Sequence, residues 1–438
     1  TVHIGISERA DLIIPAAGGP QQMPGDYLFY NGRTIKLREG SWGILRVHDS
    51  SDKGEMQTLP GRRNVPGKSP SLCPPRAPAK HFDVSAIQIP LPMLEETDGK
   101  IFALKSDIAD FISGKKPITP LVLRINVGDC ITVKLNNKLP KGRVSFHADM
   151  VAYDPLDSMG INAGFNPEQS IGPGEDKKYT FYAHPEYGES VGLVRDWGNV
   201  LLNPGIGLYG AIIIGPKGSK YTDPVTGLDS NLSSNWKANV QTQSGGMYRD
   251  FALFIQDEDE VIGTHLMPYS HSVEGTVAIN YHNSPLEGRF TPVPDMTQEF
   301  DPILYSDSSA PVLETYAGDN IKIHVLVPFS EQNHVFSIEG HSWPLEPRME
   351  GSYLVSSIQI GGTETITISP MGGAGGKFNI PGDYLYGDHR LPYKEAGLWG
   401  ILRVRPKTNL IPTLMPVSYT HLRAHETEAD LVCRLLLE

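Results

Sequence analysis

The residues of this chain that could hold a metal or move a proton are histidines close to other polar groups. His334 and His341 stand at the two ends of the segment HVFSIEGH, and Trp343 follows two residues later. Imidazole is a common ligand of zinc, copper, iron and nickel. A metal would need further donors beside this pair, and the adjoining sequence supplies none. Both residues are therefore interpreted as structural histidines.

Two imidazole–carboxylate pairs are closer together in the sequence. His147 and Asp149, in SFHADM, are two residues apart and would share one face of a strand. They could form a remnant metal pair. Asp388 and His389 are adjacent and could bind a hard or borderline cation weakly. The sequence around them favours a solvated pair in a loop.

Carboxylates gather in QDEDE, residues 256–260. Such a run could hold Mn2+ or Fe2+, but charge runs lie more often in solvated loops, and a loop is expected here. The histidines downstream have no metal-site spacing: His265, His271 and His282. The chain has no G-x-S-x-G, P-loop or zinc C-x-x-C motif, so other enzyme classes gain no support.

A further charged segment, VRDWGN, covers residues 194–199. We expect Arg195 and Asp196 to form a buried ion pair beside Trp197, which would anchor the loop that follows. A contact with a substrate is the alternative role for these residues.

Composition narrows the class of protein. The 438 residues carry a net charge of −12, which argues against a nucleic-acid surface. With 45 Gly and 36 Pro the chain is rich in turns, as all-β proteins are. No apolar run reaches membrane-spanning length, and the opening TVHIGISERADL shows no signal peptide. The cysteines show neither metal spacing nor an even disulfide set: Cys73, Cys130 and Cys433.

The strand signals divide the chain into three β units. Alternating residues in 121–137 predict a hairpin around a Gly-Asp turn. The last strands of a sandwich are predicted at 1–50, a complete sandwich at 81–216 and a third sandwich at 247–405. A Pro-rich linker at 51–80 and a second linker at 217–246 would join them, and a tail would follow at 406–438. From residue 417 the tail is similar to a translated sequencing adapter of metagenomic reading frames. His421, His425 and Cys433 would then have no biological role; a C-terminal amphipathic helix is the alternative.

One segment occurs twice. PGDYLFYNGRTIKLREGSWGILRV (24–47) and PGDYLYGDHRLPYKEAGLWGILRV (381–404) are identical at 13 of 24 positions. The first unit (1–50) and the third unit (247–405) are thus of one type, and the second unit (81–216) ends differently. The chain is expected to be an interior piece of a longer protein in which two kinds of sandwich alternate.

These segments resemble the cupredoxin domains of multicopper oxidases, over roughly residues 1–405. The family's last domain carries G-x-[WY]-x-Y-H-C-H-x-x-x-H-x-x-A-G-M-x-G, and residues 382–400 match its length. HVFSIEGH and SFHADM correspond to the family's H-P-x-H-x-H-G-H and H-x-H-G. The alternation is similar to six-domain oxidases of the ceruloplasmin and bacterial manganese-oxidase kind. The resemblance implies an all-β fold of tandem cupredoxin-like Greek-key β-sandwiches.

The family's H-C-H motif carries the chemistry. The Cys binds a mononuclear copper with two imidazoles and a weak thioether. The flanking His point the other way on the strand, toward a trinuclear copper cluster shared with another domain. Electrons pass from Cys to His and reach O2.

This chain departs from the motif where copper would bind. H-C-H falls on Gly387, Asp388 and His389, the second mononuclear His on Tyr393, and the axial Met on Leu398. Of the mononuclear ligands only His334 remains.

The other motif positions are also changed. In the first unit the Cys position is Asn31, with Tyr30 and Gly32 beside it. The second unit keeps His147 but has Asp149 where a second His would be, and the two upstream cluster His fall on Ser337 and Glu339. His147, His334 and His389 are therefore interpreted as vestigial metal positions, and neither a catalytic residue nor a bound copper is expected in this piece.

For the parent protein the resemblance implies a multicopper oxidase with copper as cofactor. It would couple the oxidation of metal ions or small reductants to the reduction of O2, outside the cytoplasm, with its other cupredoxin domains as partners. This piece alone would be inactive, with no nucleic-acid partner and no membrane span. A copper-free structural or binding protein is the alternative function. A two-domain copper nitrite reductase also needs a Cys–His core, which is missing here.

Overall fold

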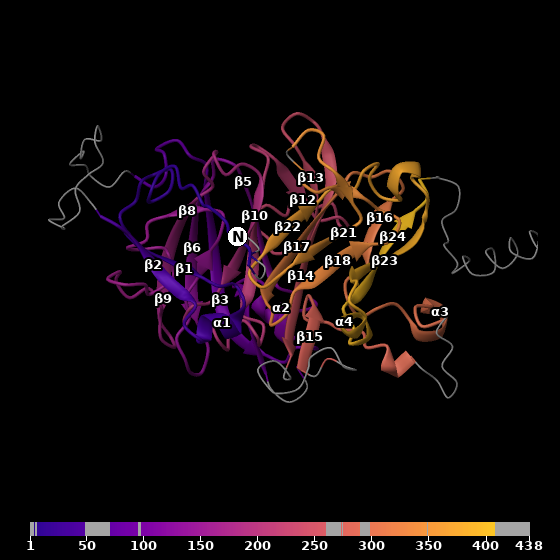
Figure 1. Ribbon diagram of the computed structural model, residues 1–438, viewed down its shortest axis with the longest axis horizontal. Coiled ribbons are helices and arrows are strands. Elements are labelled where there is room, and N and C mark those ends of the chain that lie inside the picture. The colour runs from indigo at the N-terminus through magenta and orange to yellow at the C-terminus, as the bar shows by residue number, and fades with distance from the viewer. Residues whose placement is uncertain are drawn as a thin grey trace, which may run out of the picture.

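The structure, a computed structural model, describes residue 4 and residues 7–48, 71–94, 98–259, 273, 275–289, 298–347 and 349–407. Strands make up most of its regular structure and form three units in chain order (Figure 1). This is the expected all-β class, with tandem cupredoxin-like Greek-key sandwiches. Most of the predicted linker at 51–80 and the tail from residue 408 lie outside the described residues.

The helices of the described part are short, with bounds α1 (Thr34–Arg38), α2 (Ile108–Ile112), α3 (Pro302–Tyr305) and α4 (Leu391–Glu395). Two 3-10 turns add η1 (Glu287–Arg289) and η2 (Gly376–Phe378). Among these residues no helix is long and apolar enough to cross a membrane.

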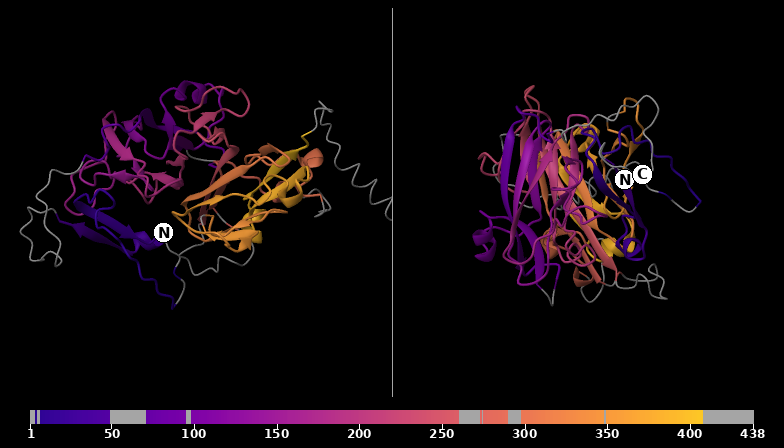
Figure 2. Two further views of the ribbon diagram at one scale, coloured as in Figure 1. Left: turned by 90° about the horizontal axis from the view of Figure 1, so that it is seen from above. Right: turned by 90° about the vertical axis from the view of Figure 1, so that its left-hand side faces the viewer.

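The first unit is a two-stranded antiparallel hairpin, β1 (Gly25–Tyr30) and β2 (Trp42–Val47), joined through α1. It lies along the second unit, close to the third (Figure 2). Leu28 packs against Met159, Ile161 and Ala163 of the second unit, and the Arg33 guanidinium donates to the Glu331 carbonyl of the third. The hairpin therefore contacts both sandwiches.

The second unit is a two-sheet sandwich. One sheet has the order β4-β3-β6-β9-β8, with bounds Gly99–Leu104, Ala79–Ile89, Cys130–Asn137, Asp176–Tyr182 and Ala152–Tyr153. The other has the order β5-β11-β10-β7, with bounds Leu121–Asn126, Tyr209–Gly215, Ser190–Arg195 and His147–Ala148. The chain crosses between the sheets repeatedly, as in a Greek key. β5 and β6 belong to opposite sheets, so the hairpin predicted at 121–137 is wrong.

The third unit is also a two-sheet sandwich. Its first sheet has the order β12-β13-β14-β17-β22, with β15 beside β14, and bounds Lys220–Thr222, Lys237–Gln241, Met247–Asp259, Ile321–Phe329, Thr365–Ile368 and Gly275–Ile279. Its second has the order β16-β24-β23-β18-β21, with bounds Leu313–Tyr316, Trp399–Arg405, Gly382–Asp388, His334–Ile338 and Ser357–Ile360. A small pair, β19 (Trp343–Pro344) and β20 (Leu354–Val355), completes it. Residues 217–246, expected as a linker, supply β12 and β13.

The second and third units are joined by an apolar core. Val122 and Tyr209 of the second unit pack with Ala252, Phe254 and Leu326 of the third, and the Tyr209 and Phe254 rings stack with centroids 5.6 Å apart. Burial of apolar surface is the main favourable term in folding, so the two sandwiches stabilise each other.

An ion pair crosses the same interface. The Arg124 guanidinium of β5 lies 3.1 Å from the Asp250 carboxylate of β14, and His324 approaches the other Asp250 oxygen to 3.0 Å. Burial alone raises the pKa of Asp250, but Arg124 and His324 outweigh it and hold the pKa well below its usual range.

Cys73 and Cys130 form a disulfide that ties the segment before β3 to the start of β6. The interpretation that the cysteines form no disulfide set is therefore wrong for this pair. The odd count misled, because the third cysteine lies in the tail outside the described residues.

Replacing both Cys73 and Cys130 by Ser should destabilise the second unit. The bridge spans 57 residues, and the chain-entropy description gives about 4 kcal/mol for a loop of that length. Denaturant unfolding of the double variant, compared with the native protein before and after reduction by a thiol, measures the loss. An unchanged midpoint together with two titratable thiols in the native protein would contradict the bridge.

Candidate functional site

Four elements of the third unit bring polar side chains around His334. His334 begins β18, Asp257 lies near the end of β14, Asp388 ends β23, and Tyr393 lies on α4. His334 Nδ1 is 2.7 Å from Asp388 Oδ2, and its Nε2 is 3.0 Å from Asp257 Oδ1. These four residues and Ser330 are named the His334 cluster. The three ionisable members His334, Asp257 and Asp388 form an ion triad, and all three side chains are fully buried.

Local structure fixes this arrangement. β18 pairs with β23 so that Phe336 lies opposite Asp388, which brings the end of β23 beside the start of β18. Gly387 has a φ of +143°, and a Cβ there would collide with the Leu398 carbonyl, so glycine lets β23 approach the chain after α4 closely. Pro392 opens α4, where it is tolerated at the first turn. α4 then carries the Tyr393 ring to 5.0 Å from the His334 ring, edge to face.

The cluster holds a buried imidazolium. Burial alone lowers the pKa of His334, but Asp257 and Asp388 outweigh it and raise the pKa to about 9. At neutral pH both ring nitrogens therefore carry protons and donate to carboxylates. A buried charge is tolerated when it is paired and hydrogen-bonded in this way.

The two carboxylates are held in turn by other groups. Asp388 Oδ1 accepts the backbone N–H of Val335 at 3.1 Å and of Arg390 at 2.9 Å. Asp257 accepts the backbone N–H of Glu331 at 3.2 Å, and the Tyr393 hydroxyl lies 3.4 Å from it. The geometry is that of a structural ion triad whose acceptors are shared with the backbone.

Two sequence expectations fail at this site. Asp388 and His389 do not form a solvated loop pair: Asp388 is buried on His334, whereas His389 is exposed, with its Nδ1 3.2 Å from the Ser337 hydroxyl. The run 256–260 does not begin as a loop, because β14 extends to Asp259 and buries Gln256 and Asp257. Residue 260, His265 and His271 lie outside the described residues.

The donor set around His334 does not fit a blue copper. Such a site needs a thiolate, two imidazoles and a weak axial sulfur. Here Asp388 has the thiolate's position, Tyr393 that of the second imidazole, and a fully buried Leu398 that of the axial ligand. Both nitrogens of the remaining imidazole are hydrogen-bonded to carboxylates. In the described residues no group of three His, Cys, Asp or Glu side chains is arranged to hold a metal.

A second polar group lies where the first unit meets the second. His147 of β7 and Arg195 of β10 are opposite each other in the ladder. Asp149 bridges them, with Oδ1 3.1 Å from His147 Nε2 and Oδ2 3.4 Å from the Arg195 guanidinium. The guanidinium also donates to the Tyr30 hydroxyl of β1, and the Tyr30 and Trp197 rings meet edge to face at 5.1 Å. These five residues are named the Arg195 cluster.

Charge neutralisation organises this cluster. Burial raises the pKa of Asp149, but Arg195 and His147 outweigh it and lower the pKa to about 2. The predicted Arg195–Asp196 pair is wrong, because Arg195, the last residue of β10, pairs with Asp149 and Tyr30 instead. Asp196 instead accepts the backbone N–H groups of Ser145 and Asn199 at 2.7 and 2.9 Å.

The three positions interpreted as vestigial metal sites do not come together. His334 and His147 belong to separate clusters, and His389 is exposed. Sequence reasoning missed Asp257 and Arg195 as the partners of these histidines. The alternation of strand side chains could have placed Arg195 on the face of Trp197, whereas nothing local in the sequence indicates Asp257.

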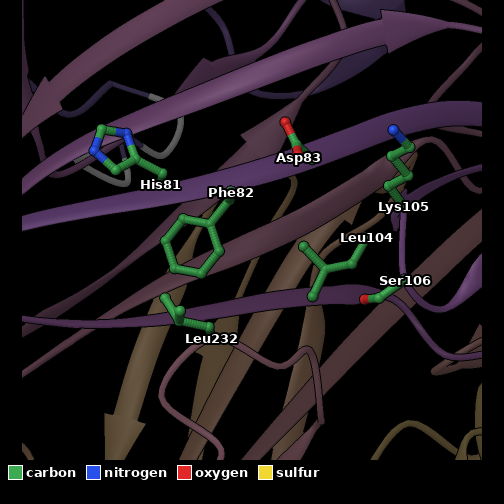
Figure 3. Close-up of a pocket in the computed structure, with 7 residues that line it drawn as sticks. All are labelled: His81, Phe82, Asp83, Leu104, Lys105, Ser106 and Leu232. Carbon is green, nitrogen blue, oxygen red and sulfur yellow. The ribbon is translucent and has the colours of Figure 1, made fainter.

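The hollow drawn in Figure 3 lies elsewhere, over β3 and the end of β4. It measures about 460 Å³ and is lined by apolar and polar side chains, namely His81, Phe82, Asp83, Leu104, Lys105, Ser106 and Leu232. It contains no member of either cluster.

No family model and no curated protein matches the chain. Among solved structures, copper nitrite reductase from Nitrosomonas europaea is 16% identical, with a TM-score of 0.47 over 76% of this chain and 95% of its own. Blue copper oxidase from the same organism is 15% identical, with a TM-score of 0.48 over 78% and 93%. Laccase from Botrytis aclada is 15% identical, with a TM-score of 0.46 over 77% and 55%.

Raising the pH should weaken the third unit. The pKa of His334 is about 9 in the folded protein, against 6.5 for an unperturbed imidazole in the unfolded chain. The stabilisation from its charge is therefore complete below pH 6.5 and is lost as the pH rises through 9. Denaturant midpoints measured between these values should fall in the native protein and stay nearly level in His334→Gln. The exposed His389→Gln is the matched control; a native profile that stays level would contradict the ion triad.

Replacing Arg195 by Met should loosen the contact between the first and second units. Asp149 would lose its main cationic partner, which costs on the order of 1–3 kcal/mol for a polar group left unpaired. The protection of the β1 amides against hydrogen exchange should drop. In Arg195→Lys, which keeps the charge, part of the protection should return; equal protection in all three proteins would refute this role of Arg195.

Proposed function

We propose that this chain is a copper-free part of a multicopper-oxidase-type protein, in which its sandwiches act as structural units rather than as electron carriers. The observation that carries the proposal is the His334 cluster. Asp388 stands where the family has its thiolate, and it is hydrogen-bonded to the imidazole that would otherwise bind copper.

Among the described residues, electron transfer has no starting point. The relay of the family runs through a cysteine sulfur bound to copper, and a carboxylate offers no comparable covalent mixing with the metal. Cys73 and Cys130 are bonded to each other and supply no thiolate. The copper centres that oxidise a metal ion or small reductant and reduce O2 would then belong to other domains of the parent protein.

The Arg195 cluster supports a structural role. Charges of the chain itself, the Arg195 guanidinium and the Asp149 carboxylate, meet at the contact between two units. The first unit contributes Tyr30 to this contact, and the Tyr30 hydroxyl accepts a hydrogen bond from the Arg195 guanidinium. Sandwiches joined in this way fix the distance and orientation of the domains on either side.

The disulfide supports a location outside the cytoplasm. Disulfides form and persist in oxidising compartments and are rare in the cytosol of most organisms. Members of the family that the sequence resembles are also typically secreted or exported to a periplasm.

A wholly copper-free structural or binding protein is the second candidate. It is favoured by the same observation, because neither cluster retains a donor set for copper. The two candidates differ in the parent chain: an oxidase requires H-x-H-G and H-C-H-x-x-x-H motifs in other domains, and a copper-free protein requires neither. Recovery of the complete reading frame decides between them.

Loading with copper tests the proposal for this piece. After incubation with Cu2+ and dialysis, the protein should retain less than one equivalent of copper by elemental analysis, and it should lack the intense visible absorption of a copper–thiolate bond. His334→Ala should give the same result as the native chain. One tightly bound copper that is lost in His334→Ala would overturn the proposal.

A further inference from the structure

The repeated hairpin occurs twice in the structure with the same construction. In β1–β2 the register runs from Gly25↔Val47 to Tyr30↔Trp42, and in β23–β24 it runs from Gly382↔Val404 to Gly387↔Trp399. The turn before the hairpin repeats too, since Met23 N–H donates to the Gly18 carbonyl and Ile380 N–H to the Gly375 carbonyl. The two copies therefore present the same backbone to their surroundings.

The first copy docks on a loop of the second unit. Asp26 is 2% exposed and accepts two bonds from Arg46, at 2.7 and 2.8 Å, and the Phe165 N–H at 2.8 Å. The Asn166 side chain pairs with the Asp26 backbone, accepting its N–H at 3.0 Å and donating to its carbonyl at 2.8 Å. The Arg46 guanidinium lies 4.3 Å from the centre of the Phe165 ring.

Shape completes this contact. A Cβ on Gly164 would collide with the Asp26 carboxylate, so glycine is required at that position of the loop. Met23, just before the hairpin, is 2% exposed. The segment Gly164-Phe165-Asn166 thus recognises a buried Asp, its Arg partner and the strand edge that carries them.

In the third unit the residues that correspond to Met23 and Asp26 are uncovered, whereas Arg403, which corresponds to Arg46, is 21% exposed because Asp307 also pairs with it. Ile380, which corresponds to Met23, is 55% exposed. Asp383 keeps its bonds to Arg403, at 3.0 and 2.8 Å, but its side chain is 41% exposed. Phe378 beside them is 77% exposed. The structure thus contains one buried copy of this recognition surface and a second copy in which Ile380 and Asp383 are exposed.

Only half of the third unit's hairpin face is open. The Trp399 ring packs on Phe300 at 4.9 Å, and its indole N–H donates to the Ser284 carbonyl at 2.7 Å, so the chain covers this half itself. Asp307 of the same covering segment pairs with Arg403. The open half is the end of the hairpin that carries Ile380 and Asp383.

We infer that Ile380, Asp383 and Arg403 form a docking surface for another β-sandwich of the second unit's type. The partner presents a Gly-Phe-Asn loop, whose backbone N–H and Asn side chain engage Asp383 while its Phe ring covers the part of Arg403 that Asp307 leaves exposed. Acceptors of one side meet donors of the other, as they do in the first copy. This docking does not depend on whether the parent protein binds copper, so its test is separate from copper loading.

A chain that begins at Ser71 tests the surface. The three large cores contain no residue before Phe82, and the disulfide is retained, so this chain keeps what folds the two sandwiches. Its Gly164–Asn166 loop is no longer covered by the first unit. It should therefore associate head to tail, with a mass in analytical ultracentrifugation that rises with concentration in the micromolar range. The full chain, whose loop is covered, should stay monomeric.

Charge reversal identifies the surface. Asp383→Arg in the shortened chain should weaken association about tenfold or more, and the exposed Asp83→Arg is the matched control that should not. A folded shortened chain that stays monomeric, or one that associates equally with Asp383→Arg, overturns the inference. If the shortened chain does not fold, Asp26→Arg in the full chain releases the first hairpin instead, and the same pair of variants is compared in that background.

Discussion

An imidazole buried away from water must have both of its nitrogens satisfied, and in the third unit this requirement is met by carboxylates. Asp257 comes from one sheet of the sandwich and Asp388 from the other, so His334 joins the two layers as well as a helix that carries Tyr393. A cation that belongs to the chain stands between anions that belong to the chain. The imidazolium and the two carboxylates hold one another in place without a further ion.

The same principle governs the contact between the first two units. Arg195 is almost fully buried, and its charge is balanced by Asp149 and shared with a hydroxyl from another unit. Strands from both units must therefore be in place before either group is fully satisfied. Polar contacts of this kind make the contact between the two units specific, while the apolar side chains around Leu28 contribute buried apolar surface to it.

The sequence predicts the class of fold well, since the repeat and the alternation are properties of neighbouring positions. That Asp388, Tyr393 and Leu398 replace copper ligands of the family stays a prediction from the motif. The sequence does not predict what those residues do instead, because Asp257 is 77 positions from His334 in the chain. A run of carboxylates looks solvated until the strand that contains it is known to be central in a sheet.

The hairpin predicted at 121–137 is wrong because it assumes that strands adjacent in sequence pair with each other. β5 and β6 instead belong to opposite sheets. The start of β6 lies beside the start of β3, its parallel neighbour in the same sheet, so Cys130 meets a residue 57 positions earlier. Periodicity alone does not reveal which strands share a sheet, and the odd number of cysteines concealed the disulfide.

The apolar layer shared by the second and third sandwiches has a consequence for their history. Tyr209, Phe254 and Leu326 are as deeply buried as any residue inside either unit. A genetic exchange that separated the two sandwiches would expose an apolar, aggregation-prone face on each. The pair is therefore expected to be duplicated and inherited as one module, and to resist the bending between neighbours that loosely tethered domains permit.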